Sequence, residues 1–178
     1  CSERGLLGIT LQWTVQNETV DFAVRLASRI PDWDILLIPR KGIPLPSDLP
    51  KRLAPNVDVA TDVGFYDVLP QLDVHATVYS TTAVEARAVG KPNLLIDLRG
   101  LATQYLGAYF QDDDSSVFVE TLEEAKHAIT HVLTSRVEDG DFSSRLISPG
   151  FGRNLRTALM RVFEQESWAM QKGMPSVG

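Results

Sequence analysis

Short and nearly continuous apolar runs alternate with amphipathic segments along most of this chain. The runs are typical of strands, at residues 5–13, 34–38, 57–61, 74–79, 93–98 and 117–119. Their apolar residues do not alternate strictly with polar ones, which indicates parallel strands covered by helices on both faces. The pattern therefore predicts an α/β fold with a Rossmann-like, doubly wound parallel sheet.

The amphipathic segments between these runs predict the helices. Asn17 is expected to cap the first helix, whose apolar residues follow helical spacing. Thr121 and Glu124 have the spacing of a capping box at the start of a later helix. Residues 64–71 should make one or two helical turns, and residues 99–114 should be irregular.

The remaining segments complete a single domain that spans residues 1–178. Five prolines within residues 39–55 predict an extended surface connection with at most a short helix. A terminal amphipathic helix is expected near residues 153–171, within a C-terminal helical region at about 151–172.

Composition limits the kinds of partner that this chain can have. Its 178 residues, 44% of them hydrophobic, suffice for one well-filled domain. The net charge of -6 argues against a nucleic-acid surface, which would need a basic patch. Cys1 is the single cysteine, so no intrachain disulfide can form and no cysteine cluster can bind zinc.

No transmembrane segment is expected, because no apolar run approaches the roughly 20 residues needed to cross a bilayer. The N-terminus also lacks the pattern of a signal peptide. We therefore expect a cytoplasmic protein, and peripheral association of the full protein with a membrane is compatible with this expectation. The chain enters a strand almost at once and has no initiator Met, which suggests a piece of a longer protein.

A hydroxyl-rich turn follows the strand at residues 74–79. Ser80, Thr81 and Thr82 place hydroxyls and backbone N–H groups at the start of a helix, where the helix dipole favours an anion. Gly90 and Pro92 are typical of the end of that helix. In doubly wound sheets ligands bind beyond the carboxyl ends of the strands, here at the loops 12–17, 39–42, 80–85 and 99–105.

Other candidate chemistry is weaker. The glycine-rich fingerprints of dinucleotide-binding and P-loop proteins are absent from the sequence. His127 and His131 have no evident third metal ligand and are expected on a solvated helix face, and the three aspartates at 112–114 are expected in an exposed loop. His75 is expected to be a structural histidine. We therefore predict no metal site and no cofactor.

The segment Ser80-Thr-Thr-Ala-Val-Glu85-Ala, between two buried strands and followed by Gly90-Lys-Pro, resembles the donor-binding C-terminal half of GT-B glycosyltransferases. It is most similar to capsule and cell-wall polymer transferases, including the CDP-glycerol glycerophosphotransferase type, and more distantly to UDP-N-acetylglucosamine 2-epimerases. The resemblance covers roughly residues 5–135. It implies a nucleotide-sugar donor, UDP- or CDP-linked, and an N-terminal acceptor domain that this chain lacks.

The resemblance also implies roles for individual residues. Ser80, Thr81 and Thr82 would meet the donor's phosphates, and Glu85 would bind the ribose hydroxyls. By position, the first loop also approaches the donor through its residues Gln12, Trp13 and Thr14.

Cationic side chains are the expected partners of the leaving phosphate. Where related transferases often have a His-Pro pair, this chain has Ile38-Pro39-Arg40-Lys41, so Arg40 or Lys41 is expected to replace that contact. Arg99 either reaches a phosphate or pairs with Asp97.

Simpler explanations exist for some of these residues. Thr82 and Glu85 also have the spacing of a capping box, which needs no ligand. Trp13 either stacks on a base or fills the core, and the core is favoured.

The leading hypothesis is the nucleotide-sugar-binding half of a glycosyltransferase that builds a bacterial surface polysaccharide. No catalytic base is nominated, and the chain by itself is expected to bind donor with little turnover. The C-terminal helix would pack toward the missing domain, through an apolar face of Leu155, Leu159, Val162, Phe163 and Trp168. The alternatives are a non-catalytic α/β interaction or sensor domain, and part of an enzyme similar to UDP-sugar epimerases.

Overall fold

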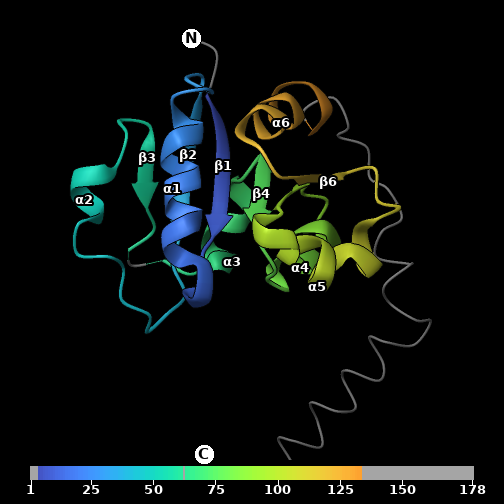
Figure 1. The fold of residues 1–178 in the computed structure, drawn as a ribbon, viewed down its shortest axis with the longest axis horizontal. Helices are drawn as coiled ribbons and strands as arrows, with labels where there is room; N and C mark the ends of the chain where they lie inside the picture. Colours follow the sequence, from blue (N-terminus) through green and yellow to red (C-terminus); the bar gives the residue numbers. More distant parts are fainter. Residues whose placement is uncertain (1–3, 62, 134–178) are drawn as a thin grey trace, which may run out of the picture. The chain divides into compact units, whose positions relative to one another are not determined.

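The computed structural model describes residues 4–61 and 63–133, which form a six-stranded parallel sheet (Figure 1). The strand order is β3-β2-β1-β4-β5-β6, and every neighbouring pair is parallel. The strands are β1 (Gly5–Thr10), β2 (Trp33–Ile38), β3 (Val57–Val59), β4 (Val74–Thr77), β5 (Asn93–Ile96) and β6 (Ser116–Val119). The order reverses between β1 and β4, which confirms the predicted doubly wound sheet.

Helices and short turns connect the strands. The helices are α1 (Gln16–Ala27), α2 (Leu49–Arg52), α3 (Phe65–Val68), α4 (Thr82–Ala88), α5 (Leu101–Phe110) and α6 (Leu122–His127), with α6 continuing as a π-helical stretch η4 (Ala128–Leu133). Three 3-10 turns are η1 (Trp13–Val15), η2 (Leu69–Gln71) and η3 (Leu98–Gly100). The short α2 and the turns α3 and η2 lie where the sequence predicted short helical pieces.

Apolar side chains fill both sides of the sheet. Leu7 and Ile9 of β1 belong to the larger core, with residues of α1, α6 and η4. On the other side Leu72 packs with residues of α3, η2 and α4. Gly8 faces Leu72 so closely that a Cβ there would lie 2.5 Å from its Cδ1. A side chain at position 8 would therefore require the Leu72 side chain to move.

The structure confirms the predicted ends of two helices. The Thr121 hydroxyl accepts from the backbone N–H of Glu124, and the Glu124 carboxylate accepts from the N–H of Thr121, which makes the predicted capping box. Gly90 has the left-handed φ of 81° expected after α4, and the N–H of Lys91 reaches back to the carbonyl of Ala86.

The expectation of an irregular segment at residues 99–114 was wrong, because most of it is the helix α5. Asp97 caps this helix by accepting bonds from the backbone N–H and the hydroxyl of Thr103, at 3.1 and 2.6 Å. Ala102, Leu106 and Phe110 lie four residues apart and are buried on one face. Capping by Asp97 and the packing of this apolar face thus stabilise the helix α5.

The start of the first helix also differs from the prediction. Strand β1 ends at Thr10, not at residue 13, and the 3-10 turn η1 leads directly into α1. Asn17 therefore lies inside the helix and is not its cap. The hydroxyl of Thr19 instead donates to the carbonyl of Val15 at 2.8 Å, inside the first turn.

The expectation of an exposed loop at residues 112–114 was wrong for Asp113. Its carboxylate receives the Nε and Nη2 groups of Arg87 at 2.9 and 3.3 Å, and the hydroxyl of Ser116 at 2.5 Å. The Arg87 side chain is only 4% exposed and the Asp113 side chain 10%. This pair therefore joins α4 to the start of β6 in a largely buried place.

Some expectations concern residues outside the described ranges. The terminal helix near 153–171, its apolar face and Cys1 all lie there, so these expectations stay untested. Within residues 4–61 and 63–133, no helix is both long and apolar enough to span a membrane. The same part of the chain has no group of three or more side chains suited to metal binding.

Candidate functional site

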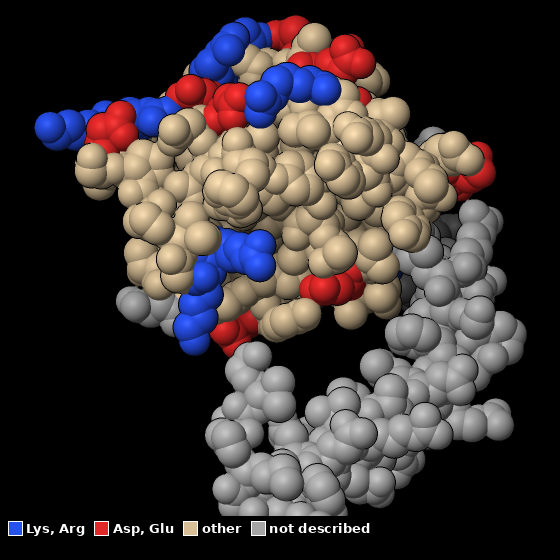
Figure 2. Space-filling view, turned by 60° about the horizontal axis from the view of Figure 1, so that its bottom comes forward, with Lys and Arg blue, Asp and Glu red and all other residues tan. Residues whose placement is uncertain are grey.

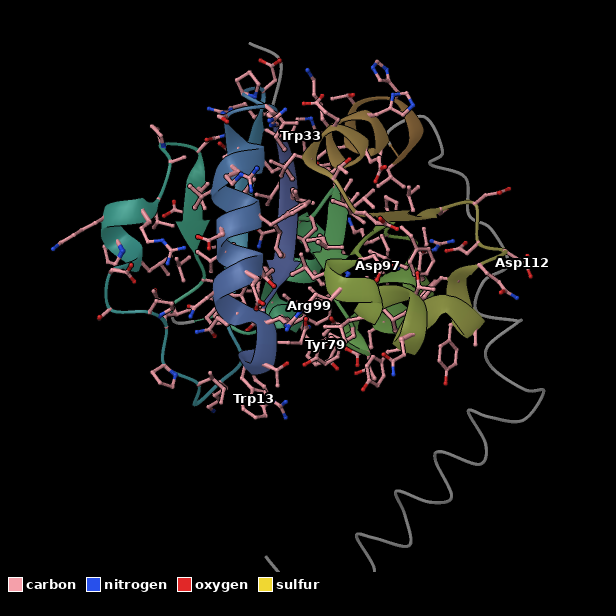
Figure 3. The ribbon with its side chains drawn as sticks, in the orientation of Figure 1. Trp13, Trp33, Tyr79, Asp97, Arg99 and Asp112 are labelled. Carbon is pink, nitrogen blue, oxygen red and sulfur yellow. The ribbon has the colours of Figure 1, made fainter. Side chains whose placement is uncertain are left out.

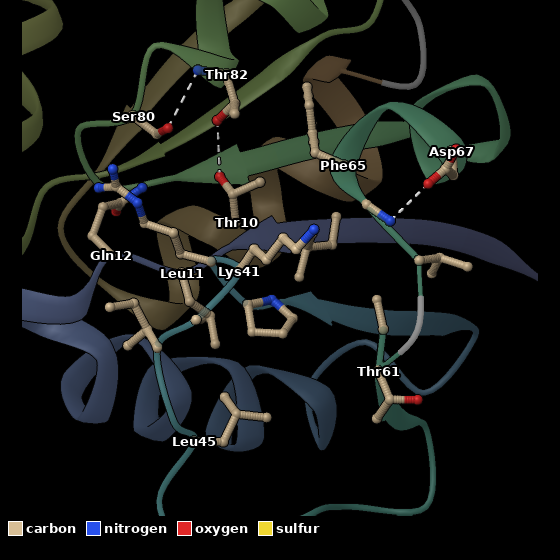
Figure 4. Close-up of a pocket in the computed structure, with 18 of the residues that line it drawn as sticks. Thr10, Leu11, Gln12, Lys41, Leu45, Thr61, Phe65, Asp67, Ser80 and Thr82 are labelled. Atoms are coloured by element: carbon tan, nitrogen blue, oxygen red, sulfur yellow. Dashed lines mark hydrogen bonds between the residues drawn. The ribbon is translucent and has the colours of Figure 1, made fainter. Parts of the chain in front are cut away.

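A large pocket lies at the carboxyl ends of β1, β2, β3 and β4, at the reversal in strand order (Figure 4). Its volume is about 1000 Å³. The polar and charged lining residues are Thr10, Gln12, Arg40, Lys41, Thr61, Asp67, Ser80, Thr81 and Thr82. The pocket is therefore large enough for a nucleotide-sized ligand and lies at the edge of the sheet that the sequence predicted.

Two cations from the loop after β2 line this pocket. Arg40 and Lys41 are both exposed, and Figure 4 shows Lys41 extending over the hollow between the strand ends. Figure 2 shows mixed basic and acidic side chains along the upper edge of the view, and one smaller basic patch with acidic neighbours on the otherwise largely uncharged lower face. A protein with a net charge of -6 thus presents local positive charge at the pocket.

The turn after β4 joins the first strand through side chains. The Ser80 hydroxyl accepts from the backbone N–H of Thr82 at 3.3 Å. The Thr82 hydroxyl lies 3.0 Å from the hydroxyl of Thr10, at the end of β1 (Figure 4). Thr10 is buried, so this contact fixes the turn against the neighbouring strand.

His75 lies behind Thr10 in a buried network. Its Nε2 is 3.2 Å from the Thr10 hydroxyl, and its Nδ1 is 2.7 Å from Oδ1 of Asn93. Burial lowers the pKa of His75 to about 4, and the bond to Asn93 opposes that shift only in part. His75 is therefore a neutral structural histidine near pH 7, which confirms the prediction.

Gln12 carries a buried acceptor without a partner. Its side chain is 9% exposed, and its Nε2 donates to the hydroxyl of Thr77 at 2.7 Å. Among the described residues, its Oε1 has no hydrogen-bond partner. A buried acceptor without a hydrogen bond is unfavourable unless a ligand or a water molecule donates to it. Gln12 is therefore a candidate ligand-binding residue.

Glu85 does not form the capping box that its spacing with Thr82 allowed. The Thr82 side chain bonds to Thr10, and the N-cap residue of α4, Thr81, makes no side-chain cap bond. The Glu85 carboxylate instead accepts from the hydroxyl of Tyr66 at 2.8 Å, and this bond raises the pKa of Tyr66. Glu85 lies one turn into α4, beside the pocket but not among its lining residues.

Three other predicted site residues are not among the residues that line the pocket, and Figure 3 labels two of them, Trp13 and Arg99. Trp13 is 64% exposed, so the favoured core position was wrong. The Thr14 hydroxyl contacts that of Tyr79. Arg99 pairs with Glu18 at 3.2 Å and not with Asp97, whose carboxylate caps α5.

The sequence did not identify every residue at the pocket. Thr10 was assigned to the first strand, although its place at the strand's carboxyl end was a signal for a lining position. Asp67 and Phe65 also line the pocket, from α3. The Asp67 carboxylate accepts from the backbone N–H of Gly64 at 2.7 Å, at the start of α3.

Comparisons with known proteins identify the fold. No protein-family model matches the chain, and no curated protein matches it. Among solved structures, the calicheamicin glycosyltransferase CalG4 aligns over 95% of the chain with a TM-score of 0.56 and 22% identity. SnogD, a glycosyltransferase from Streptomyces nogalater, aligns over 90% with a TM-score of 0.58 and 15% identity. The wall teichoic acid polymerase TagF aligns over 94% with a TM-score of 0.56 and 13% identity.

The chain has the fold of GT-B glycosyltransferases, which confirms the resemblance at the level of the fold. It spans 43% of the CalG4 chain, 44% of SnogD and 46% of TagF. Less than half of each neighbour is thus matched, consistent with the C-terminal half that the sequence resembles. Another neighbour, the spinosyn rhamnosyltransferase SpnG, was solved in complex with thymidine diphosphate, at a TM-score of 0.58 and 16% identity.

Proposed function

We propose that this chain is the donor-binding half of a glycosyltransferase, and that its pocket binds a nucleotide-activated sugar or polyol phosphate. The observation that carries the proposal is the pocket itself. It combines two cations, three consecutive hydroxyl residues and a buried unpaired acceptor at the strand-order reversal of a GT-B fold. Two proteins of similar fold support it: SpnG was solved with thymidine diphosphate, a nucleoside diphosphate such as these donors contain, and a TagF variant was soaked with CDPG.

The lining residues suit a diphosphate in chemical terms. Arg40 offers a planar fork of donors, and Lys41 offers a mobile point charge. Ser80 accepts from the Thr82 N–H, so its own hydroxyl hydrogen is available to donate to a phosphate oxygen. In a glycosyl transfer these groups would stabilise the negative charge that develops on the departing nucleotide.

The arrangement favours this proposal over a non-catalytic interaction domain. That alternative predicts no cations around Ser80 and explains Thr82 and Glu85 as a capping box. Arg40 and Lys41 line the same pocket as Ser80, and the capping box is not formed. The proposed biological setting is the synthesis of a bacterial surface polysaccharide, with the wall teichoic acid polymerase TagF as the neighbour that supports it.

The proposal predicts nucleotide affinity that depends on the two cations. In isothermal titrations with UDP, CDP, TDP and GDP, at least one ligand should bind the wild-type chain. In the double variant Arg40→Gln/Lys41→Gln the same ligand should bind about 10-fold more weakly or worse, since charge-assisted bonds to phosphate are lost.

Lys51→Gln is the matched control, because Lys51 is an exposed lysine on α2 outside the pocket lining. Its affinity should stay within about 2-fold of the wild type, as expected for a distant surface charge. Absence of binding by all four nucleotides, or equal affinity in the double variant, would contradict the proposal and favour the non-catalytic domain.

A further inference from the structure

The donors and acceptors of the buried hydrogen-bond network around Thr10 can be assigned by starting from Asn93. Asn93 uses its amide nitrogen to donate to the carbonyl of Ala83 at 2.9 Å and to the Ser116 hydroxyl at 3.3 Å. Its oxygen Oδ1 therefore faces Nδ1 of His75 and can only accept. The neutral imidazole thus carries its hydrogen on Nδ1, and its Nε2 is an acceptor.

This tautomer sets the direction of the next bonds. Thr10 has one hydroxyl hydrogen, and its oxygen lies near two groups that can only accept, Nε2 of His75 at 3.2 Å and the carbonyl of Ala76 at 3.4 Å. If Thr10 donated to Thr82 instead, the buried Nε2 would have no donor, which is unfavourable. Thr82 must therefore donate its hydrogen to Thr10.

The consequence is a fixed polarity at the pocket wall. With its hydrogen directed at Thr10, Thr82 presents only oxygen lone pairs to the pocket. A phosphate oxygen at neutral pH also carries lone pairs and needs a donor. Thr82 is therefore poorly suited to the phosphate contact that the sequence resemblance implied.

Gln12 also presents an acceptor to the pocket, through separate hydrogen bonds that involve Thr77. The Thr77 hydroxyl donates to the carbonyl of Thr10 at 3.5 Å, so its oxygen accepts from Nε2 of Gln12. With its Nε2 on Thr77, the Gln12 amide leaves its buried Oε1 as an unpaired acceptor among the described residues. Thr82 and Gln12, which both line the pocket, can therefore accept hydrogen bonds from donor groups of a ligand.

We propose that Thr82 and Gln12 accept hydrogen bonds from hydroxyl groups of the ligand, while its phosphates lie against Ser80, Arg40 and Lys41. This inference rests on the proposed donor-binding function and narrows it. The pocket lining thus offers donors and cations at Ser80, Arg40 and Lys41, and acceptors at Thr82 and Gln12. The hydroxyl groups belong to the ribose or to the transferred sugar or polyol.

The first test measures the network without any ligand. Long-range proton–nitrogen NMR of the wild-type chain should show His75 as the tautomer with hydrogen on Nδ1 and a bare Nε2. A histidine with its hydrogen on Nε2 would reverse the direction of the chain of bonds and overturn the inference, whether or not the chain binds nucleotides.

The second test compares Thr82→Val with Thr82→Ser and Ser80→Ala. Three ligands are titrated into each: inorganic pyrophosphate, the nucleoside diphosphate that binds most tightly, and its sugar conjugate. Thr82→Val should weaken the nucleotide or the conjugate about 10-fold and leave pyrophosphate within about 2-fold, and Thr82→Ser should restore affinity. Ser80→Ala should weaken all three.

The outcomes distinguish a failure of this inference from a failure of the proposed donor-binding function. Equal weakening of pyrophosphate and nucleotide in Thr82→Val would mean that Thr82 donates to phosphate, which overturns this inference and preserves the proposed function. Unchanged affinity for every ligand in Thr82→Val also overturns it. If the wild-type chain binds none of the ligands, the proposed function and this inference both fail.

Discussion

Replacing Asp113 by asparagine should lower the free energy of unfolding by about 3–5 kcal/mol, because the guanidinium of Arg87 would lose the Asp113 carboxylate in a largely buried place. Two bonds from the Arg87 guanidinium reach the Asp113 carboxylate, and Arg87 is 5% exposed. For a chain of this length the loss corresponds to a fall in melting temperature of roughly 10 °C. Urea denaturation of both proteins measures the difference directly.

Asp112→Asn is the matched control, since Asp112 is the exposed neighbour of Asp113. It should change stability by less than about 1 kcal/mol. The double variant Arg87→Met/Asp113→Asn should be more stable than Asp113→Asn alone, because it no longer buries a guanidinium that has lost the Asp113 carboxylate. A loss below about 1 kcal/mol in Asp113→Asn would contradict the structural role assigned to this ion pair.

Acidification from pH 7 to pH 5 should cost about 2 kcal/mol of stability through His75 alone. The folded protein holds this imidazole neutral, because burial lowers its pKa to about 4 from the 6.5 that is usual for histidine. Between these values the unfolded chain binds the proton and the folded chain does not. The stabilisation is therefore fully present above pH 6.5 and is lost as the pH falls toward 4.

His75→Gln isolates this effect, since glutamine does not titrate. The variant will be less stable than the wild type at pH 7 if the bonds to Thr10 and Asn93 are impaired, but its stability should change less between pH 7 and pH 5. The exposed His127→Gln should keep the pH dependence of the wild type. Equal pH dependence in His75→Gln and the wild type, measured by urea denaturation, would show that His75 is not held neutral.

The sheet was predictable because its strands are continuous apolar runs separated by clear turn and cap signals. The helix α5 was not, although Ala102, Leu106 and Phe110 have helical spacing. Its cap is Asp97, six residues before Thr103 and separated from it by a left-handed glycine, so the local pattern for a helix start is absent. The burial of Asp113 was not predictable from a local pattern either, because its partner Arg87 is 26 residues away.

The position of the site could be predicted from the sheet. Which of its side chains donate hydrogen bonds and which accept them could not. Once β2 and β4 are parallel neighbours of β1, the residues after them, Arg40 and Ser80 among them, meet at one edge. The bond of Thr82 to Thr10 spans 72 residues and depends on the orientation of Asn93, which no local pattern contains. Spacing alone could therefore not tell a phosphate contact from a hydroxyl contact.

The measurement that tests the central claim most directly is an NMR titration of the isotope-labelled chain with the tightest binder among UDP, CDP, TDP and GDP. The account predicts that amide shifts concentrate at the strand ends that line the pocket, at residues 10–12, 40–42 and 80–82. Shifts confined to another surface, such as the hollow between α1 and α6 lined by Arg25 and Glu123, would contradict it. So would the absence of any shift at millimolar nucleotide.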